Sequence, residues 1–151
     1  MHSQSANKSS ASPPIGSRAW CSASSHATGS LGSSTALFKD PYAGLPSERG
    51  LTLADLASQG RLETQVIGFC GELFQPAIHA IGDRANSEVI AEATTHPAGR
   101  LRHRIEHAQS VRPQDVAPLA QSGWIASMQP SQLVSDRDMA LTHWGERRSK
   151  Y

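Results

Sequence analysis

The sequence lacks the features that mark several large classes of protein. Of 151 residues only Cys21 and Cys70 are cysteines, and their spacing forms neither a C-x-x-C redox motif nor a disulfide framework. No run approaches the roughly 20 apolar residues that span a bilayer. The formal net charge is only +1, so no strong field attracts nucleic acid or lipid. We therefore expect a cytoplasmic protein with no nucleic-acid partner and no membrane partner.

The N-terminal part of the chain is also poor in large apolar residues. Residues 1–35 include 12 serines, and the polar start has no apolar core of a secretory signal. Such a segment cannot bury enough surface to offset the entropy lost on ordering it. We expect residues 1–27 to form a disordered serine-rich leader and residues 28–151 to form the folded domain.

Regular hydrophobic periodicity begins near residue 75. Short apolar or alternating runs predict strands, and apolar residues that share one helical face predict helices between them. Asp83 is placed to cap the first of these helices. The expected elements are a strand at 76–81, a helix at 83–95, a strand at 101–107, a helix from Pro113 to just before Gly123, and a strand at 124–128. This alternation predicts an α/β fold with a parallel sheet.

Two histidines stand at the ends of consecutive predicted strands. His79 and His107 are 28 residues apart, and the C-terminal edge of a parallel sheet is where α/β proteins build their sites. Neutral imidazole is a common zinc ligand. The spacing leaves two interpretations open, because two core histidines that each donate to a backbone carbonyl would produce the same pattern.

The second of these strands also contains a competing motif. "HRIEH" supplies His103, Glu106 and His107 in the H-x-x-E-H order of an inverted zincin peptidase, which requires a helix. The flanking residues instead alternate with period two. In a strand, His103 and His107 share one face with Ile105, while Arg104 and Glu106 point the other way and are expected to pair with a covering helix.

Three longer motifs together resemble the amidohydrolase superfamily, specifically the amidohydrolase 3 group with its N-substituted formamide deformylases. These are "HAIGDRAN", "RHRIEHAQ" and "IASMQPSQLVSDRDM", and the resemblance covers roughly residues 28–151. It implies a partial TIM (β/α)8 barrel of the metal-dependent hydrolase type. His79 would be the fifth-strand metal ligand and His107 the sixth-strand ligand of one or two divalent ions, with zinc expected. The implied reaction is hydrolysis of C–N bonds other than peptide bonds in small amide or N-formyl compounds.

The sequence departs from the family pattern in several places. It has no H-x-H pair, no lysine shortly before "GSLGS", and it ends at Tyr151 before an eighth strand. These differences predict a fragment that is incomplete and inactive as an isolated chain. The alternative is a non-catalytic remnant that survives as an interaction module.

Overall fold

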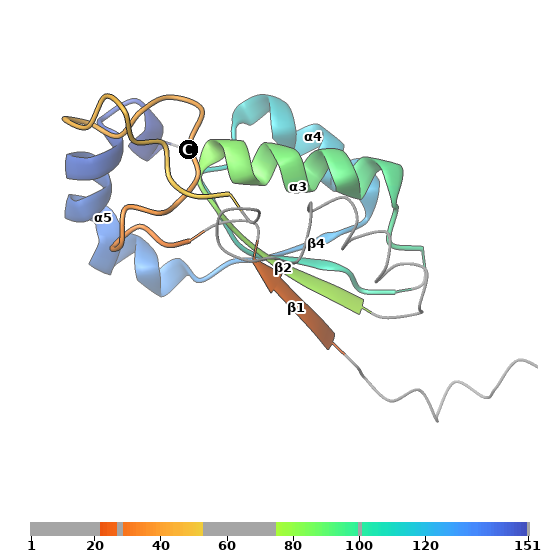
Figure 1. Cartoon of the computed structure of the whole chain (residues 1–151). Coiled ribbons are helices and arrows are strands. Elements are labelled where there is room, and N and C mark those ends of the chain that lie inside the picture. Colours follow the sequence, from red (N-terminus) through yellow and green to blue (C-terminus); the bar gives the residue numbers. More distant parts are fainter. Residues whose placement is uncertain (1–21, 27–28, 53–74, 100, 151) are drawn as a thin grey trace, which may run out of the picture.

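The computed structural model describes residues 22–26, 29–52, 75–99 and 101–150 (Figure 1). Helices and strands alternate along most of this length. In chain order the elements are β1 (Ser22–His26), β2 (Gln75–Ile81), α3 (Asp83–Thr95), β3 (Arg104–Gln109), α4 (Pro113–Ser122), β4 (Ile125–Ser127), α5 (Pro130–Trp144) and the 3₁₀-helix η2 (Arg148–Lys150).

The strands of the described residues form one parallel sheet in the order β1-β2-β3-β4. Helices α3 and α4 lie on the same side of this sheet (Figure 1). Parallel neighbours require crossover connections, and α3 and α4 supply them between β2 and β3 and between β3 and β4. The predicted α/β class and its parallel sheet are therefore confirmed. All the carboxyl ends of the strands consequently lie at one edge.

The expected element boundaries are confirmed in part. Helix α3 has its predicted limits, and α4 begins at Pro113 and ends before Gly123, whose left-handed φ of 74° suits a helix C-terminus. Strand β3 begins three residues later than expected and continues to Gln109. Strand β4 covers Ile125–Ser127 of the expected 124–128, and Pro130 begins α5, which the sequence analysis did not predict.

One boundary prediction is wrong in part. Residues 22–26 were assigned to the disordered leader, yet they form β1 and pair in register with β2 from Ser22↔Gln75 to His26↔His79. Backbone hydrogen bonds carry this pairing, and they do not depend on the apolar content from which disorder was inferred. The rest of the predicted leader, residues 1–21, lies outside the described residues, and the domain boundary at residue 27 stays a prediction.

Two buried clusters hold these elements together. The first joins α3 to the sheet through residues such as Ile78, Val89 and Ile105, each with no exposed surface. The second joins α5 to the segment 29–52, where the ring of Phe38 packs 5.2 Å from that of Trp144. The second cluster includes Ile81 at the end of β2, so it fixes this segment beside the carboxyl edge of the sheet.

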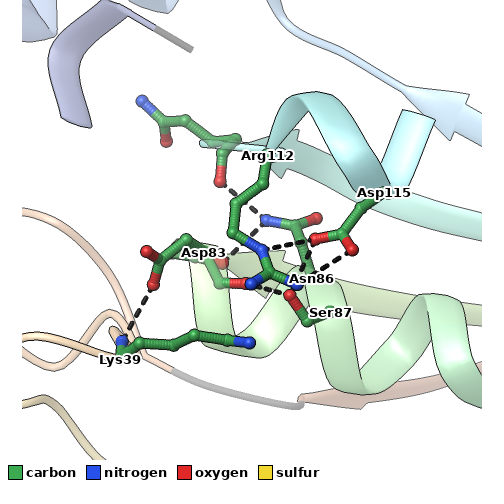
Figure 2. A network of polar contacts seen from close by, with 8 residues as sticks. Lys39, Asp83, Asn86, Ser87, Arg112 and Asp115 are labelled. Carbon is green, nitrogen blue, oxygen red and sulfur yellow. Dashed lines mark hydrogen bonds and ion pairs between the residues drawn. The ribbon is translucent and has the colours of Figure 1, made fainter. Parts of the chain in front are cut away.

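A polar network joins the first turns of α3 and α4 (Figure 2). Two guanidinium nitrogens of Arg112 donate to the two carboxylate oxygens of Asp115 at 2.8 and 2.9 Å, and the Ser87 hydroxyl donates to Asp115 at 2.8 Å. Burial alone would raise the pKa of Asp115, but the hydrogen bonds and positive charge of Arg112, with the Ser87 bond, hold that pKa below its usual value.

This network predicts a pH-dependent loss of stability. A carboxyl whose pKa is depressed on folding stabilises the folded state above its unfolded pKa of about 3.9, and this contribution is lost as the pH falls through the folded value. We expect Asp115→Asn to lower the free energy of unfolding by about 2 kcal/mol at pH 7. The difference should shrink as the pH falls below about 3.9. Urea unfolding of both chains across this range measures it, and a difference that does not change with pH would contradict the assignment.

Candidate metal centre

The two predicted site histidines meet at the carboxyl edge of the sheet. His79 is near the end of β2 and His107 near the end of β3, and these strands are neighbours. Their ring centroids are 4.5 Å apart with an interplanar angle of 75°. The two rings therefore approach each other on adjacent strands.

The predicted alternation of side chains along β3 is interrupted at His107. Ile78 pairs with Ile105, and both belong to the core cluster, whereas His79 pairs with Glu106 on the opposite face. Simple alternation would therefore return His107 to the face of Ile105, away from His79. A register shift between the pairs His79↔Glu106 and Ile81↔Gln109 adds a residue to β3 at this point. This bulge redirects the His107 ring towards His79.

The backbone conformation of the bulge is unusual for its residues. His107 and Ala108 have φ values of 69° and 46°, and Ser110 follows with a φ of 66°. Positive φ in non-glycine residues is uncommon and costs energy that the surrounding contacts must offset. Strain of this kind gathers at functional sites, so the backbone provides an indication of function that is independent of the motifs.

The ring nitrogens of the two histidines have different surroundings. Nε2 of His79 is 2.9 Å from the carbonyl oxygen of Gly29, and a carbonyl can only accept, so this nitrogen carries the proton. In the neutral ring Nδ1 then bears the lone pair. A metal-binding histidine usually donates a hydrogen bond from its other ring N–H to a group such as a backbone carbonyl. Nδ1 of His107 is buried and makes no hydrogen bond within the described residues.

The charged neighbours of the histidines pair with each other. Arg104 donates to Glu106 at 2.7 Å, which corrects the expectation that both would pair with a covering helix. They lie on the sheet face opposite the core cluster, where no described helix packs. Burial alone would raise the pKa of Glu106, but hydrogen bonds from Ser127 and Arg104 and the nearby charges lower it. Glu106 therefore stays ionised and engaged at neutral pH.

The inverted-zincin interpretation is wrong. Residues 104–109 form a strand, so His103 and His107 are not one helical turn apart. The His103 ring is buried and packs 5.1 Å from that of Trp124 on the core side of the sheet, whereas His107 contacts His79. The two histidines of the motif therefore do not converge on one ion.

Asp83 does not cap α3 as expected. Gly82 occupies the N-cap position and makes no side-chain capping bond, while Asp83 is the first helical residue. The Asp83 carboxylate instead accepts a 2.9 Å hydrogen bond from the backbone N–H of Lys39 (Figure 2). The capping role was predicted wrongly because the carboxylate bonds to Lys39, which is distant in the sequence, and not to the first turn of its own helix. Asp83 thereby ties the 29–52 segment to the helix.

Sequence reasoning missed Asn86, which supports the site from α3. Asn86 is fully buried, and its amide donates to backbone carbonyls of residues near both histidines. A signal was present, since Asn86 is spaced four and seven residues before Ile90 and Ala93 on the apolar face of the helix. A polar residue on such a face needs a hydrogen-bonding partner when buried.

No complete metal site is formed among the described residues. In these parts of the chain, no group of three or more His, Cys, Asp or Glu side chains is arranged to hold an ion. Among these same residues there is also no helix with the length and apolar content to cross a membrane. The arrangement is that of a parallel α/β protein with a two-histidine candidate metal centre at the carboxyl edge of its sheet.

Comparison with known proteins places this arrangement in a family. The model of the amidohydrolase family matches residues 14–150, so the chain belongs to this family. It is 34% identical over 125 residues to "Protein LONG AFTER FAR-RED 3" of Arabidopsis thaliana, covering 80% of this chain and 21% of that protein. It is also 34% identical over 125 residues to "Putative amidohydrolase YtcJ" of Bacillus subtilis, covering 82% and 23%.

Solved structures agree with this assignment. An uncharacterized metal-dependent hydrolase from Pyrococcus furiosus aligns with a TM-score of 0.70 and 26% identity, covering 85% of this chain and 26% of that one. One from Pyrococcus horikoshii aligns with a TM-score of 0.69 and 29% identity, covering 85% and 25%. The chain therefore spans about a quarter or less of the length of these relatives.

Proposed function

We propose that His79 and His107 are ligands of one divalent ion, expected to be zinc, in a metal-dependent hydrolase. The observation that carries the proposal is the 4.5 Å approach of the two rings at the carboxyl edge of the sheet, on a strand bulged to bring them together. Family membership and the metal-dependent hydrolases among the similar structures support it. The four parallel strands would be consecutive strands of a TIM (β/α)8 barrel.

The proposed reaction is hydrolysis of C–N bonds other than peptide bonds in small amide or N-formyl compounds. A bound divalent ion polarises a carbonyl oxygen and lowers the pKa of a bound water. The chain itself would supply ligand nitrogens and hold them in place. The Gly29 carbonyl fixes which nitrogen of His79 carries the proton. Glu106, engaged by Arg104 and Ser127, is not assigned the role of general base.

We further propose that the isolated chain is incomplete and does not catalyse the reaction. A catalytic zinc usually has three protein ligands and an open position, and two are proposed here. With two ligands, zinc binding should be weak and should contribute little to folding. Activity would then belong to a complete barrel that adds the remaining ligands and a general base, which is worth roughly 10²- to 10⁴-fold in rate.

Zinc binding by the purified chain tests the proposed ligands. Competition with a chromophoric chelator should detect one zinc per chain, and His79→Ala should weaken binding more than about 100-fold, beyond the usual effect of an outer-shell change. His143→Ala is the matched control, because this partly exposed residue lies in the last turn of α5. Equal binding by both variants would refute the assignment. Metal-dependent turnover of an N-formyl compound by the isolated chain would refute its proposed incompleteness.

An interaction module is the second candidate function. The residues after β4 favour it, since Met128, Leu133 and Val134 are 63, 75 and 84% exposed although they are large and apolar. Large exposed apolar side chains, here within seven residues of sequence, suit a protein interface. A stable oligomer that binds no zinc would support this function over the hydrolase, whereas a zinc-binding monomer would exclude it.

A further inference from the structure

One buried amide connects the two strand ends that carry the histidines. Nδ2 of Asn86 is 2.7 Å from the carbonyl oxygen of Gln109, two residues after His107. The same nitrogen is 2.9 Å from the carbonyl oxygen of Gly82 and 3.5 Å from that of Ala80, the residue after His79. Asn86 lies near the start of α3, which begins at Asp83 (Figure 2).

Only the donor half of this side chain is used. Asn86 has no exposed surface, and its Oδ1 makes no hydrogen bond within the described residues. A reversed amide would set Oδ1 against the carbonyl oxygens, so the contacts define its orientation. A buried group that donates to two strand ends, at the cost of an unsatisfied acceptor, acts on those strand ends rather than on the helix alone.

The position of the Gln109 carbonyl decides what this contact controls. Gln109 is the first residue that pairs with β2 again after the bulge at His107 and Ala108. Its carbonyl oxygen also accepts a 3.1 Å bond from the backbone N–H of Gly82. The bulge residues with positive φ lie between two fixed points. Glu106 pairs with His79 on one side, and the Gln109 carbonyl accepts two hydrogen bonds on the other. Release of the carbonyl would allow the strained backbone to relax.

We propose that Asn86 is a positioning residue that holds the His107 ring against the His79 ring by fixing the bulge of β3. It acts through the Gln109 carbonyl, and its hydrogen bonds go to backbone carbonyls and not to either ring. The part of this inference that concerns metal affinity rests on the proposed function, whereas the part that concerns ring contact does not. Outer-shell groups that orient ligands typically affect metal affinity 10- to 100-fold.

Asn86→Ser is the most informative variant. A serine here can place its hydroxyl against the Gly82 carbonyl four residues earlier, as the Ser87 hydroxyl lies 2.6 Å from the carbonyl oxygen of Asp83. It is too short to reach Gln109, so it removes the contact between the strands while keeping a polar contact in the helix. Asn86→Ala removes both contacts. Ser87→Ala is the matched control, because Ser87 belongs to the same turn but bonds to Asp115 in α4.

The test combines two readouts on the full chain. In the metal-free chain, NMR cross-relaxation between ring protons should report the contact between His79 and His107. This signal should persist in Ser87→Ala and disappear in Asn86→Ser and Asn86→Ala. Zinc affinity should fall about 10- to 100-fold in Asn86→Ser and less than about 2-fold in Ser87→Ala.

Each outcome decides between positioning and mere stabilisation. The inference is overturned if Asn86→Ser retains the ring contact and binds zinc as tightly as Ser87→Ala does. This holds whatever effect Asn86→Ser has on the free energy of unfolding. Absence of the ring contact in the unsubstituted chain would overturn it as well. If Asn86→Ala does not fold, Asn86→Ser decides alone. If the unsubstituted chain binds no zinc, the proposed function fails, and the ring contact still tests the role of Asn86.

Discussion

Gly82→Ala should lower the free energy of unfolding by about 3 kcal/mol or more and separate the two histidines. Gly82 joins β2 to α3 with φ 107° and ψ 150°, a conformation open almost only to glycine. A Cβ at this position would lie 2.1 Å from the Leu37 carbonyl oxygen and 2.7 Å from its carbon. Both atoms are backbone, and Leu37 is fixed by its own bond to the Ile81 carbonyl.

The substitution should also disturb the contact between His79 and His107, because Gly82 bonds to both Gln109 and Asn86. Its N–H donates to the Gln109 carbonyl, and its own carbonyl accepts from Asn86. Gly99→Ala is the matched control, since Gly99 has a φ of 57° but nothing lies within 4 Å of an added Cβ. That variant should lose about 1 kcal/mol from backbone strain alone. Urea unfolding compares the two, and equal losses would show that the Leu37 contact does not restrict residue 82.

His107→Ala should abolish measurable zinc binding, whereas His103→Ala should leave it unchanged. Removal of one of two proposed ligands should weaken binding more than about 100-fold, beyond what loss of an outer-shell group costs. His103 is also buried, and burial lowers the pKa of its ring, but it packs on Trp124 in the core. Its loss should therefore lower stability by about 1–3 kcal/mol without changing metal affinity.

The two substitutions separate a metal role from a structural role within one strand. Chelator competition measures affinity, and chemical unfolding measures stability on the same samples. Parallel loss of zinc binding in both variants would contradict the account, because it would mean that the two histidines act together. Unchanged zinc binding in His107→Ala would show that His107, the residue that the bulge positions, is not a metal ligand.

Local periodicity was sufficient to predict the framework of the site. Helix α3 was located because its buried residues repeat on one face, and α4 because proline and glycine mark its ends. The placement of His79 and His107 at one edge of the sheet followed from their places near the ends of adjacent parallel strands, whereas the face on which His107 lies did not. These features depend on residues close in the sequence, whose side-chain pattern reports the backbone period directly.

Long-range contacts explain most of what the sequence did not reveal. The bulge at His107 is a shift in the register of β3 on β2, so alternation alone predicted the wrong face for this ring. Asp83 was assigned to a cap because its partner, the N–H of Lys39, is 44 residues away. The short strand β1 carries no apolar pattern and is specified by pairing with β2. In each case the interacting residues are too far apart in the sequence for a local pattern to predict their contact.

The most direct test of the account is to identify which ring nitrogens bind a single ion. The chain can be prepared with nitrogen-labelled histidine and loaded with an NMR-active isotope of cadmium as a substitute for zinc. We expect one cadmium resonance with scalar coupling to ring nitrogens of both His79 and His107, and none to His103 or His143. Coupling to only one of the two rings, or to a different pair of histidines, would contradict it.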